Sequence, residues 1–365
     1  METPSSPPQN RDATPCSVHG LALAAGREGV RSAEDLAADD PLRAAIEAAR
    51  KYASRSQAAN TTSAYRSDWE HFERWCEAKA VASMPSTPQV VALYIAELAE
   101  GWGGEAPRKP ATIVRRLAAI NAFHKRAGQF LPASQKYAEI SLVLQGILRE
   151  KGTAQTAKRP VTVELALQML ASSEAAQPAA QARDKALLLI GLAGAFRRSE
   201  LAALRLEHLS WHREGITILV GRSKTDQQGR GREVEIPLGA KPESCPVEAL
   251  KRWLEAACLE KDSAGPLFRA VHKSGAIGTA AMNPQSISGL VRHRAEAAGL
   301  NDASRGKHLY SGHSLRAGFV TAAAAGGASD RQIMRQTGHK SHKMIDRYSR
   351  REQMDRRKAA QKVGF

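Results

Sequence analysis

The chain has 365 residues, of which 42% are hydrophobic, so it is long enough for two domains with cores of their own. Its formal net charge of +16 at pH 7 makes nucleic acid the partner to consider first, ahead of a protein that is merely basic. The four cysteines have no CxxC spacing, which argues against a disulfide framework and a zinc ribbon. The N-terminus has no secretory pattern, and no apolar run reaches the roughly 20 residues of a membrane span. These observations predict a cytoplasmic protein.

The first part of the chain is expected to be an arm followed by a helical domain. Residues 1–40 are rich in Pro, Ser, Gly and Ala without sustained periodicity, which favours a mobile N-terminal arm. In residues 61–78 the aromatic side chains of Tyr65, Trp69, Phe72 and Trp75 recur at spacings of three and four, which predicts an amphipathic helix. A second helix is predicted between breaks at 83–88 and 101–104, and two more over about 112–128 and 136–151. Residues 41–151 are therefore expected to form a small all-α domain.

The rest of the chain is expected to be a linker and a second domain that is mainly α with a small β-hairpin. Residues 152–160 have the composition of a linker. In the second domain, residues 161–365, helices are predicted over 162–173 and 183–194, the latter buried on all sides. Strands are predicted over 216–220 and 233–238, the second with Val234, Ile236 and Leu238 on one face, around a Gly-, Lys- and Gln-rich loop at 221–232. Helices are expected from there to the C-terminus.

Two clusters carry cationic side chains that could bind a phosphate. Arg197 follows the buried helix in the segment GAFRRSEL, where it needs an anionic partner or a route to water. An ion pair with Glu200 would meet that need without any function. Lys224 stands in the segment SKTD of the hairpin loop, from which it could reach a ligand, although most such lysines are merely solvated.

Two further clusters add histidines and a tyrosine. His313 and Arg316 in GHSLR are three residues apart, so on a helix they share a face that offers an imidazole and a guanidinium together. The alternative is a surface pair at a helix start. His339 in TGH is followed nine residues later by Tyr348 in DRYSR. A lone tyrosine is mostly structural, because a phenol with a pKa near 10 needs nearby cations and a base to become a nucleophile.

Together, these clusters supply what phosphoryl transfer without a metal requires. Two guanidiniums can hold the non-bridging oxygens of a phosphodiester, and a lysine can protonate the leaving 5′ oxygen. Four histidines also lie within 35 residues: His308, His313, His339 and His342. No cysteine accompanies them, so we expect neither a metal site nor a cofactor.

These segments resemble the tyrosine recombinase (phage integrase) family over roughly residues 50–355. GAFRRSEL, SKTD, GHSLR, TGH and DRY occur in the family's order, and NTTSAYRSDWEHFERWC is similar to its core-binding domain. The resemblance implies an N-terminal all-α, DNA-binding core-binding domain and a C-terminal α+β catalytic domain. It further implies a site-specific recombinase or integrase that cuts and rejoins double-stranded DNA through a 3′-phosphotyrosine and a Holliday junction, and a homotetramer on that DNA.

The resemblance also implies roles for the arginines and for one carboxylate. Arg197 and Arg316 would grip the scissile phosphate. Arg197 is assigned rather than its neighbour Arg198 because it has the Arg-x-Ser-Glu spacing. Glu200 matches an acidic position that would orient its neighbours and not react.

The remaining roles concern protons and the nucleophile. Lys224 would protonate the 5′ hydroxyl that leaves, and His313 would assist proton transfer at the nucleophile. His339 would donate a hydrogen bond to a phosphate oxygen, and Tyr348 would attack the phosphorus. The family often has Leu where Thr337 stands, a difference that we expect to affect packing only.

Several alternatives remain open at this point. A type IB topoisomerase-like enzyme or a telomere resolvase would use a related active site, and a non-catalytic DNA-binding protein could keep the fold. The basic tail at 349–362 fits a helix that docks onto a neighbouring protomer, and it equally fits a segment that binds the DNA backbone or is disordered.

Overall fold

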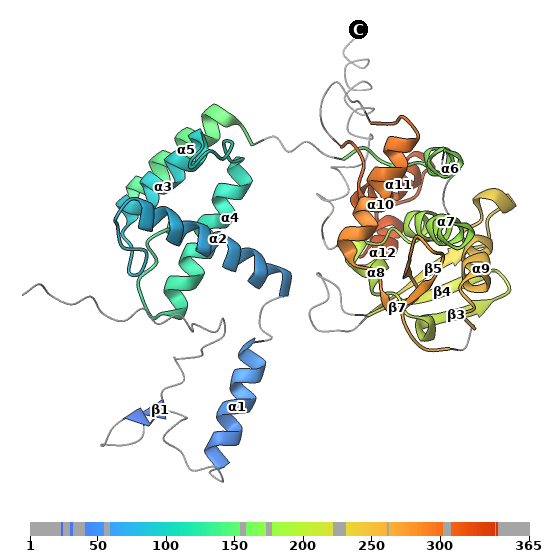
Figure 1. Ribbon diagram of the computed structural model, residues 1–365, viewed down its shortest axis with the longest axis horizontal. Coiled ribbons are helices and arrows are strands. Elements are labelled where there is room, and N and C mark those ends of the chain that lie inside the picture. Colours follow the sequence, from blue (N-terminus) through green and yellow to red (C-terminus); the bar gives the residue numbers. More distant parts are fainter. Residues whose placement is uncertain are drawn as a thin grey trace, which may run out of the picture. The chain divides into compact units, whose positions relative to one another are not determined.

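In a computed structural model, the chain divides into two units, Met1–Gln155 and Thr156–Phe365 (Figure 1). The structure describes residues 23–24, 30–31, 41–54, 59–153, 158–172, 177–221, 231–260, 263–301, 308–339 and 341. The predicted arm at 1–40 lies outside these residues, apart from two paired strands of two residues, β1 (Leu23–Ala24) and β2 (Val30–Arg31). Residues 154–157 of the predicted linker also lie outside them. The arm and the linker therefore stay predictions.

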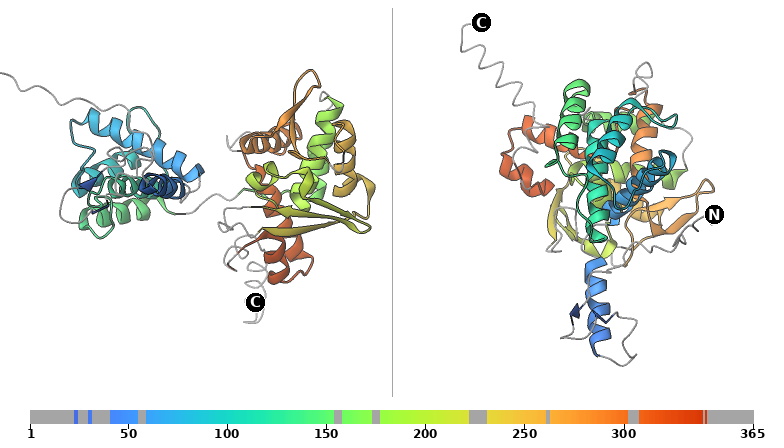
Figure 2. Two further views of the ribbon diagram at one scale, coloured as in Figure 1. Left: turned by 90° about the horizontal axis from the view of Figure 1, so that it is seen from below. Right: turned by 90° about the vertical axis from the view of Figure 1, so that its left-hand side faces the viewer.

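The N-terminal unit is built of helices. They are α1 (Pro41–Ser54), α2 (Ala59–Ala78), α3 (Pro88–Glu100), α4 (Pro110–Arg126) and α5 (Ala138–Lys151). A proline in the first turn begins α3 and α4, where a missing N–H costs nothing. Helix α2 packs against α4, and α3 against α5, so that α2–α5 form one bundle in both views of Figure 2. The four helices predicted from periodicity are confirmed, and Trp69, Phe72, Trp75 and Tyr94 form the bundle's core.

The C-terminal unit combines helices with two small antiparallel sheets. Its longer helices are α6 (Val163–Ala171), α7 (Pro178–Ala193), α9 (Pro246–Ala256), α10 (Pro284–Ala297), α11 (Gly312–Ala325) and α12 (Asp330–Thr337). Its short helices are α8 (Arg198–Ala202), η1 (Leu206–His208) and η2 (Pro242–Ser244). One sheet has the order β3 (Leu209–His212), β4 (Gly215–Val220), β5 (Arg232–Pro237), and the other pairs β6 (Arg269–Val271) with β7 (Ile277–Ala281).

Helix α7 is the central helix of this unit. It packs against α6, α9 and α11 (Figure 1), and its residues from Ala186 to Leu192 are buried, as predicted. It begins at Pro178, five residues before the predicted start. Its first turns contain mainly alanines, which form a helix readily but give no apolar periodicity.

The β-structure is more extensive than the sequence predicted. The prediction of helices only after the hairpin was wrong, because β6 and β7 form a second sheet there. Strand β3 was also missed: it has four residues and none of them is fully buried, so it shows no clear alternation. Val234 and Ile236 are buried as predicted, but Leu238 lies beyond β5 and is 46% exposed.

Among the described residues, no helix is both long and apolar enough to cross a membrane.

Candidate active site

The turn between α7 and α8 presents Arg197 beside Glu200. Arg197 is the N-cap residue of α8, and its backbone N–H donates to Oε2 of Glu200 at 3.0 Å, a bond that caps the helix. Its Nη1 donates to Oε1 of the same carboxylate at 2.6 Å. Glu200 is almost fully buried, so this carboxylate is a fixed point that orients the Arg197 side chain.

Arg232 is a third arginine of the site, and it was missed from the sequence. It is the first residue of β5, opposite Val220 in the register, and its Nη2 donates to Oε2 of Glu200 at 3.0 Å. Its Nη1 donates to the backbone oxygen of Gln336 on α12. A signal for it exists: Arg232 stands two and four residues before Val234 and Ile236, and the period of two places all three on the inward face of the strand.

Glu200 is thus ionised although it is buried. Burial alone would raise its pKa, but its bond to the Arg197 backbone and the positive charges of Arg232 and Arg197 together lower the pKa below its ordinary value. The carboxylate links the start of α8 to the first residue of β5. That strand closes the hairpin whose loop carries Lys224.

Arg316 lies on α11 and is 1% exposed. Its Nη1 donates to the carbonyl oxygen of Ala195 at 2.8 Å. Ala195 has a φ of 49°, a left-handed conformation that costs a residue with a Cβ roughly 1–2 kcal/mol. Because this strained turn continues directly into Arg197, Arg197 and Arg316 are anchored to the same three-residue segment.

A glycine allows α11 to reach this position. A Cβ at Gly318 would lie 1.8 Å from the backbone oxygen of Val161, so only glycine fits there. The backbone N–H of Val161 in turn donates to the oxygen of Ser314 at 3.0 Å. This close approach fixes how tightly α11, the helix that carries His313 and Arg316, packs against the segment at Val161.

His339 is buried next to Arg316 and bonded on both ring nitrogens. Nε of Arg316 donates to its Nε2 at 3.3 Å, and its Nδ1 lies 3.0 Å from the hydroxyl of Thr337. That hydroxyl donates to the backbone oxygen of Ile333 at 2.7 Å. The expectation that Thr337 affects packing only was wrong, because its hydroxyl holds the imidazole. Gly338, between Thr337 and His339 in the chain, adopts the left-handed conformation that ends α12.

The proton of His339 can be placed from these bonds. The Nε of an arginine always carries its hydrogen, so Nε2 of His339 must accept. In the neutral ring Nδ1 then carries the proton and donates to Thr337. Burial, with smaller contributions from the charges of Arg316 and Arg197, lowers the pKa of His339 to about 4, so the ring is neutral near pH 7.

His313 stands at the start of α11, at the exposed edge of the site. Its pKa is lowered, mainly because the surrounding protein shields the ring from water and further because Arg316 and Arg197 are close. A neutral imidazole near pH 7 can accept a proton. The position therefore suits a base at the rim of the site.

The structure brings five of the seven predicted residues into one site: Arg197, Glu200, His313, Arg316 and His339. Lys224 and Tyr348 lie outside the described residues, so their places stay predictions. Among the described site residues, the guanidiniums of Arg197 and Arg232 bind the one carboxylate, and a third guanidinium, that of Arg316, is bonded to Ala195 and His339. Both histidines are neutral near pH 7. The surplus of two positive charges suits a phosphodiester, which has one negative charge and shifts it onto its oxygens during displacement.

Comparisons with known proteins agree with this chemistry. Residues 161–354 match the phage integrase family, and residues 51–129 match the phage integrase N-terminal SAM-like domain. A protein described as an integrase/recombinase xerD homolog, from Selenomonas ruminantium, is 37% identical over 303 residues, which cover 82% of this chain and 84% of that protein.

A solved structure shows a similar fold. The Tn1549 transposon integrase in complex with transposon right end DNA has a TM-score of 0.54 at 16% identity, with 84% of this chain and 97% of that chain covered. The XerA recombinase matches at a lower TM-score of 0.39 and 18% identity, with coverage of 82% and 89%.

Proposed function

The chain belongs to the tyrosine recombinase (phage integrase) family, and on that premise we propose that its polar site holds the scissile phosphate of a DNA recombination site while Tyr348 attacks it. As a member of that family the chain is a site-specific recombinase, which cleaves and rejoins DNA. The roles of single residues, the path of the protons and the assembly on DNA are what we propose here.

The observation that carries the proposal is the surplus of positive charge in the site, where three guanidiniums stand against the single carboxylate of Glu200. Glu200 neutralises one of the three guanidiniums and holds Arg197 and Arg232 in place. Arg316 is held by the Ala195 carbonyl instead. Two positive charges then remain for the two non-bridging oxygens of a phosphodiester, and guanidinium forks fit such oxygens in a plane.

The chemistry is a displacement at phosphorus with no change of oxidation state. The phenolic oxygen of Tyr348 forms a bond to phosphorus as the bond to the 5′ oxygen breaks, which leaves a 3′-phosphotyrosine. His313 takes the phenolic proton, because its lowered pKa leaves it neutral, and Lys224 gives a proton to the leaving 5′ oxygen. Rejoining reverses these steps with the 5′ hydroxyl of the partner duplex, so no energy source is consumed.

His339 acts through Arg316 and not on the phosphate. The resemblance implied a hydrogen bond from this histidine to a phosphate oxygen. Its contacts favour the tautomer in which the one N–H is on Nδ1 and donates to Thr337, because Nε2 accepts from Arg316. We therefore assign His339 to the positioning of Arg316.

Strand exchange requires two duplexes that are each cut at two places. Four active sites meet that need, so we propose a homotetramer on double-stranded DNA, with residues 41–151 as a DNA-binding domain and 161–365 as the catalytic domain. The N-terminal SAM-like match over residues 51–129 supports the first assignment. The family assignment favours a recombinase over the type IB topoisomerase, telomere resolvase and non-catalytic alternatives.

Strand exchange between two labelled duplexes tests the proposal. The binding site is first selected by the full chain from a random duplex library. Two duplexes of different length that carry this site are then mixed with the chain, without ATP and with EDTA. We expect strands of hybrid length from the wild type and none from Tyr348→Phe. Binding without breakage, or breakage and resealing without strands of hybrid length, would contradict it.

A further inference from the structure

Arg115 in the N-terminal unit is an exposed arginine held by a buried carboxylate. Its Nε donates to Oδ2 of Asp68 on α2 at 2.8 Å, and its Nη2 donates to Oδ1 at 2.9 Å. The Arg115 side chain is 50% exposed, whereas that of Asp68 is 3% exposed. In the pair Lys79–Glu97, by contrast, both side chains are exposed, and surface ion pairs of this kind contribute little to stability.

The Asp68 carboxylate is itself fixed from behind. Nε of the buried Arg116 lies 3.5 Å from its Oδ1. Nη1 of Arg116 contacts Nδ1 of His71 at 2.9 Å and donates to the hydroxyl of Tyr94 at 3.0 Å. Burial lowers the pKa of His71, so this ring is neutral near pH 7 and accepts from the guanidinium. A buried network thus orients Asp68, which already has Arg116 as a counter-charge.

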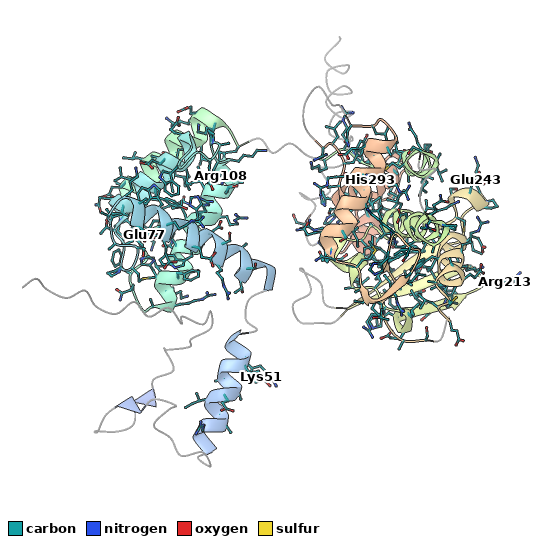
Figure 3. All side chains as sticks on the ribbon, in the orientation of Figure 1. Lys51, Glu77, Arg108, Arg213, Glu243 and His293 are labelled. Atoms are coloured by element: carbon teal, nitrogen blue, oxygen red, sulfur yellow. The ribbon has the colours of Figure 1, made fainter. Side chains whose placement is uncertain are left out.

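The free edge of the Arg115 guanidinium is directed away from this network. A guanidinium has five N–H groups, and Asp68 takes one from Nε and one from Nη2. The remaining fork of Nη1 and Nη2 hydrogens has no protein acceptor in the described part of the chain. By helical spacing, Ala111, Ala118 and Ala122 lie on the same face of α4 as Arg115, and such small residues let a ligand approach the helix closely. Figure 3 shows the side chains of this bundle, with Arg108 labelled just before α4.

We infer that Arg115 recognises a guanine of the recombination site, with Asp68 holding its guanidinium in the orientation for that contact. Guanine presents two acceptors, O6 and N7, side by side in the major groove, and the free fork of an arginine matches both. Holding the side chain before binding removes the entropy cost of ordering it. This inference rests on the proposed function, because it assigns a part of the same DNA site.

A contact with a phosphate is the competing assignment. It would need only a positive charge, and flexible exposed cations such as Lys125 on the last turn of α4 supply that without any buried network. A rigidly held fork has its advantage where direction matters, which is at a base edge. The two assignments predict different results for base preference.

Selection from a random duplex library by the full chain tests the inference. We expect the wild type to prefer guanine at one position of each protomer's site, by about tenfold or more over other bases. Arg115→Ala should lose the preference at that position only. Arg115→Gln should change it toward adenine, whose N6 and N7 match a carboxamide. Asp68→Asn should weaken the guanine preference without moving it.

A control variant separates the effect of Arg115 from that of any cation on the helix, and unfolding curves show whether each variant still folds. Lys125→Ala, a change on the same helix, should leave the selected sequence as it is. If Arg115→Ala weakens every sequence equally, or changes nothing, the inference is overturned while the proposed function stands. If the wild type selects no DNA sequence at all, both fall. Asp68→Asn provides the test at this site should the Arg115 variants unfold.

Discussion

The hydroxyl of Thr337 lies 3.0 Å from Nδ1 of His339 and determines which nitrogen of that ring carries the proton. Because the hydroxyl gives its own hydrogen to the Ile333 carbonyl, it accepts from Nδ1, and Nε2 is left to accept from Arg316. A chain of polar bonds therefore runs from the last turn of α12 to a guanidinium of the active site.

Thr337→Val should slow DNA cleavage, because valine keeps the shape but offers no acceptor to Nδ1. We expect a loss of about tenfold in the single-turnover cleavage rate on a nicked substrate, equal to the net worth of one hydrogen bond of about 1.4 kcal/mol. DNA affinity should change little. Thr337→Ser, which keeps the hydroxyl, is the matched control. Equal rates for Val and Ser would remove this hydroxyl from the mechanism.

The stability of the protein should depend on pH through His339. Its pKa is about 4 in the folded chain, against 6.5 for an ordinary histidine, so between these values the unfolded chain binds a proton that the folded chain does not. Stability is therefore lost as the pH falls below 6.5. Between pH 7 and 5 we expect His339 to account for on the order of 2 kcal/mol of that loss.

Urea unfolding of the wild type and His339→Gln at pH 7 and pH 5 measures this contribution. The wild type should lose more stability than the variant over the interval. The difference between the two isolates His339 from the other titrating groups. Parallel losses in both proteins would show that this imidazole is not held neutral.

Arg232→Lys should impair cleavage although the charge is kept. A lysine cannot bind the Glu200 carboxylate and the Gln336 carbonyl at once, so Arg197 would lose part of its support. We expect cleavage to fall about tenfold, on the scale of one lost hydrogen bond, with DNA affinity nearly constant. Arg213→Lys, an exposed arginine labelled in Figure 3, should have no such effect. Wild-type cleavage by Arg232→Lys would separate this residue from the site.

Arg197→Lys and Arg316→Lys should each reduce cleavage by on the order of 100-fold or more, the scale at which loss of one preorganised donor affects an oxyanion site. An ammonium supplies the charge but not the planar fork. Arg198→Lys is the internal control, because Arg198 is exposed and donates to Gln285 at 2.9 Å. If Arg198→Lys were the damaging change, the assignment of Arg197 would be wrong.

The helices with long apolar stripes could be predicted from the sequence, because their cores repeat every three to four residues. The stripe of Trp69, Phe72 and Trp75 is the clearest example. The strands β3, β6 and β7 could not, because they are short and only partly buried, and their pairing depends on segments far away in the chain. The start of α7 could not be predicted either, because its first turns contain mainly alanines and show no apolar periodicity.

The site was predictable where single side chains carry the chemistry and not where they support it. Arg197, His313, Arg316 and His339 stand in recognisable segments. The partners that hold them act through contacts made by the fold: Ala195 offers a carbonyl and Thr337 a hydroxyl, and neither residue type signals such a role. Arg232 was predictable in part, because the alternation of its strand places its side chain on the inward face.

Identification of the residue that becomes joined to DNA tests the central claim most directly. The full chain is incubated with a nicked duplex that carries its selected site, digested with trypsin and nuclease, and analysed by mass spectrometry. We predict a nucleotide on the phenolic oxygen of Tyr348 through a 3′ phosphate, and no adduct from Tyr348→Phe. An adduct on another residue, or an undiminished adduct in Tyr348→Phe, would contradict the account.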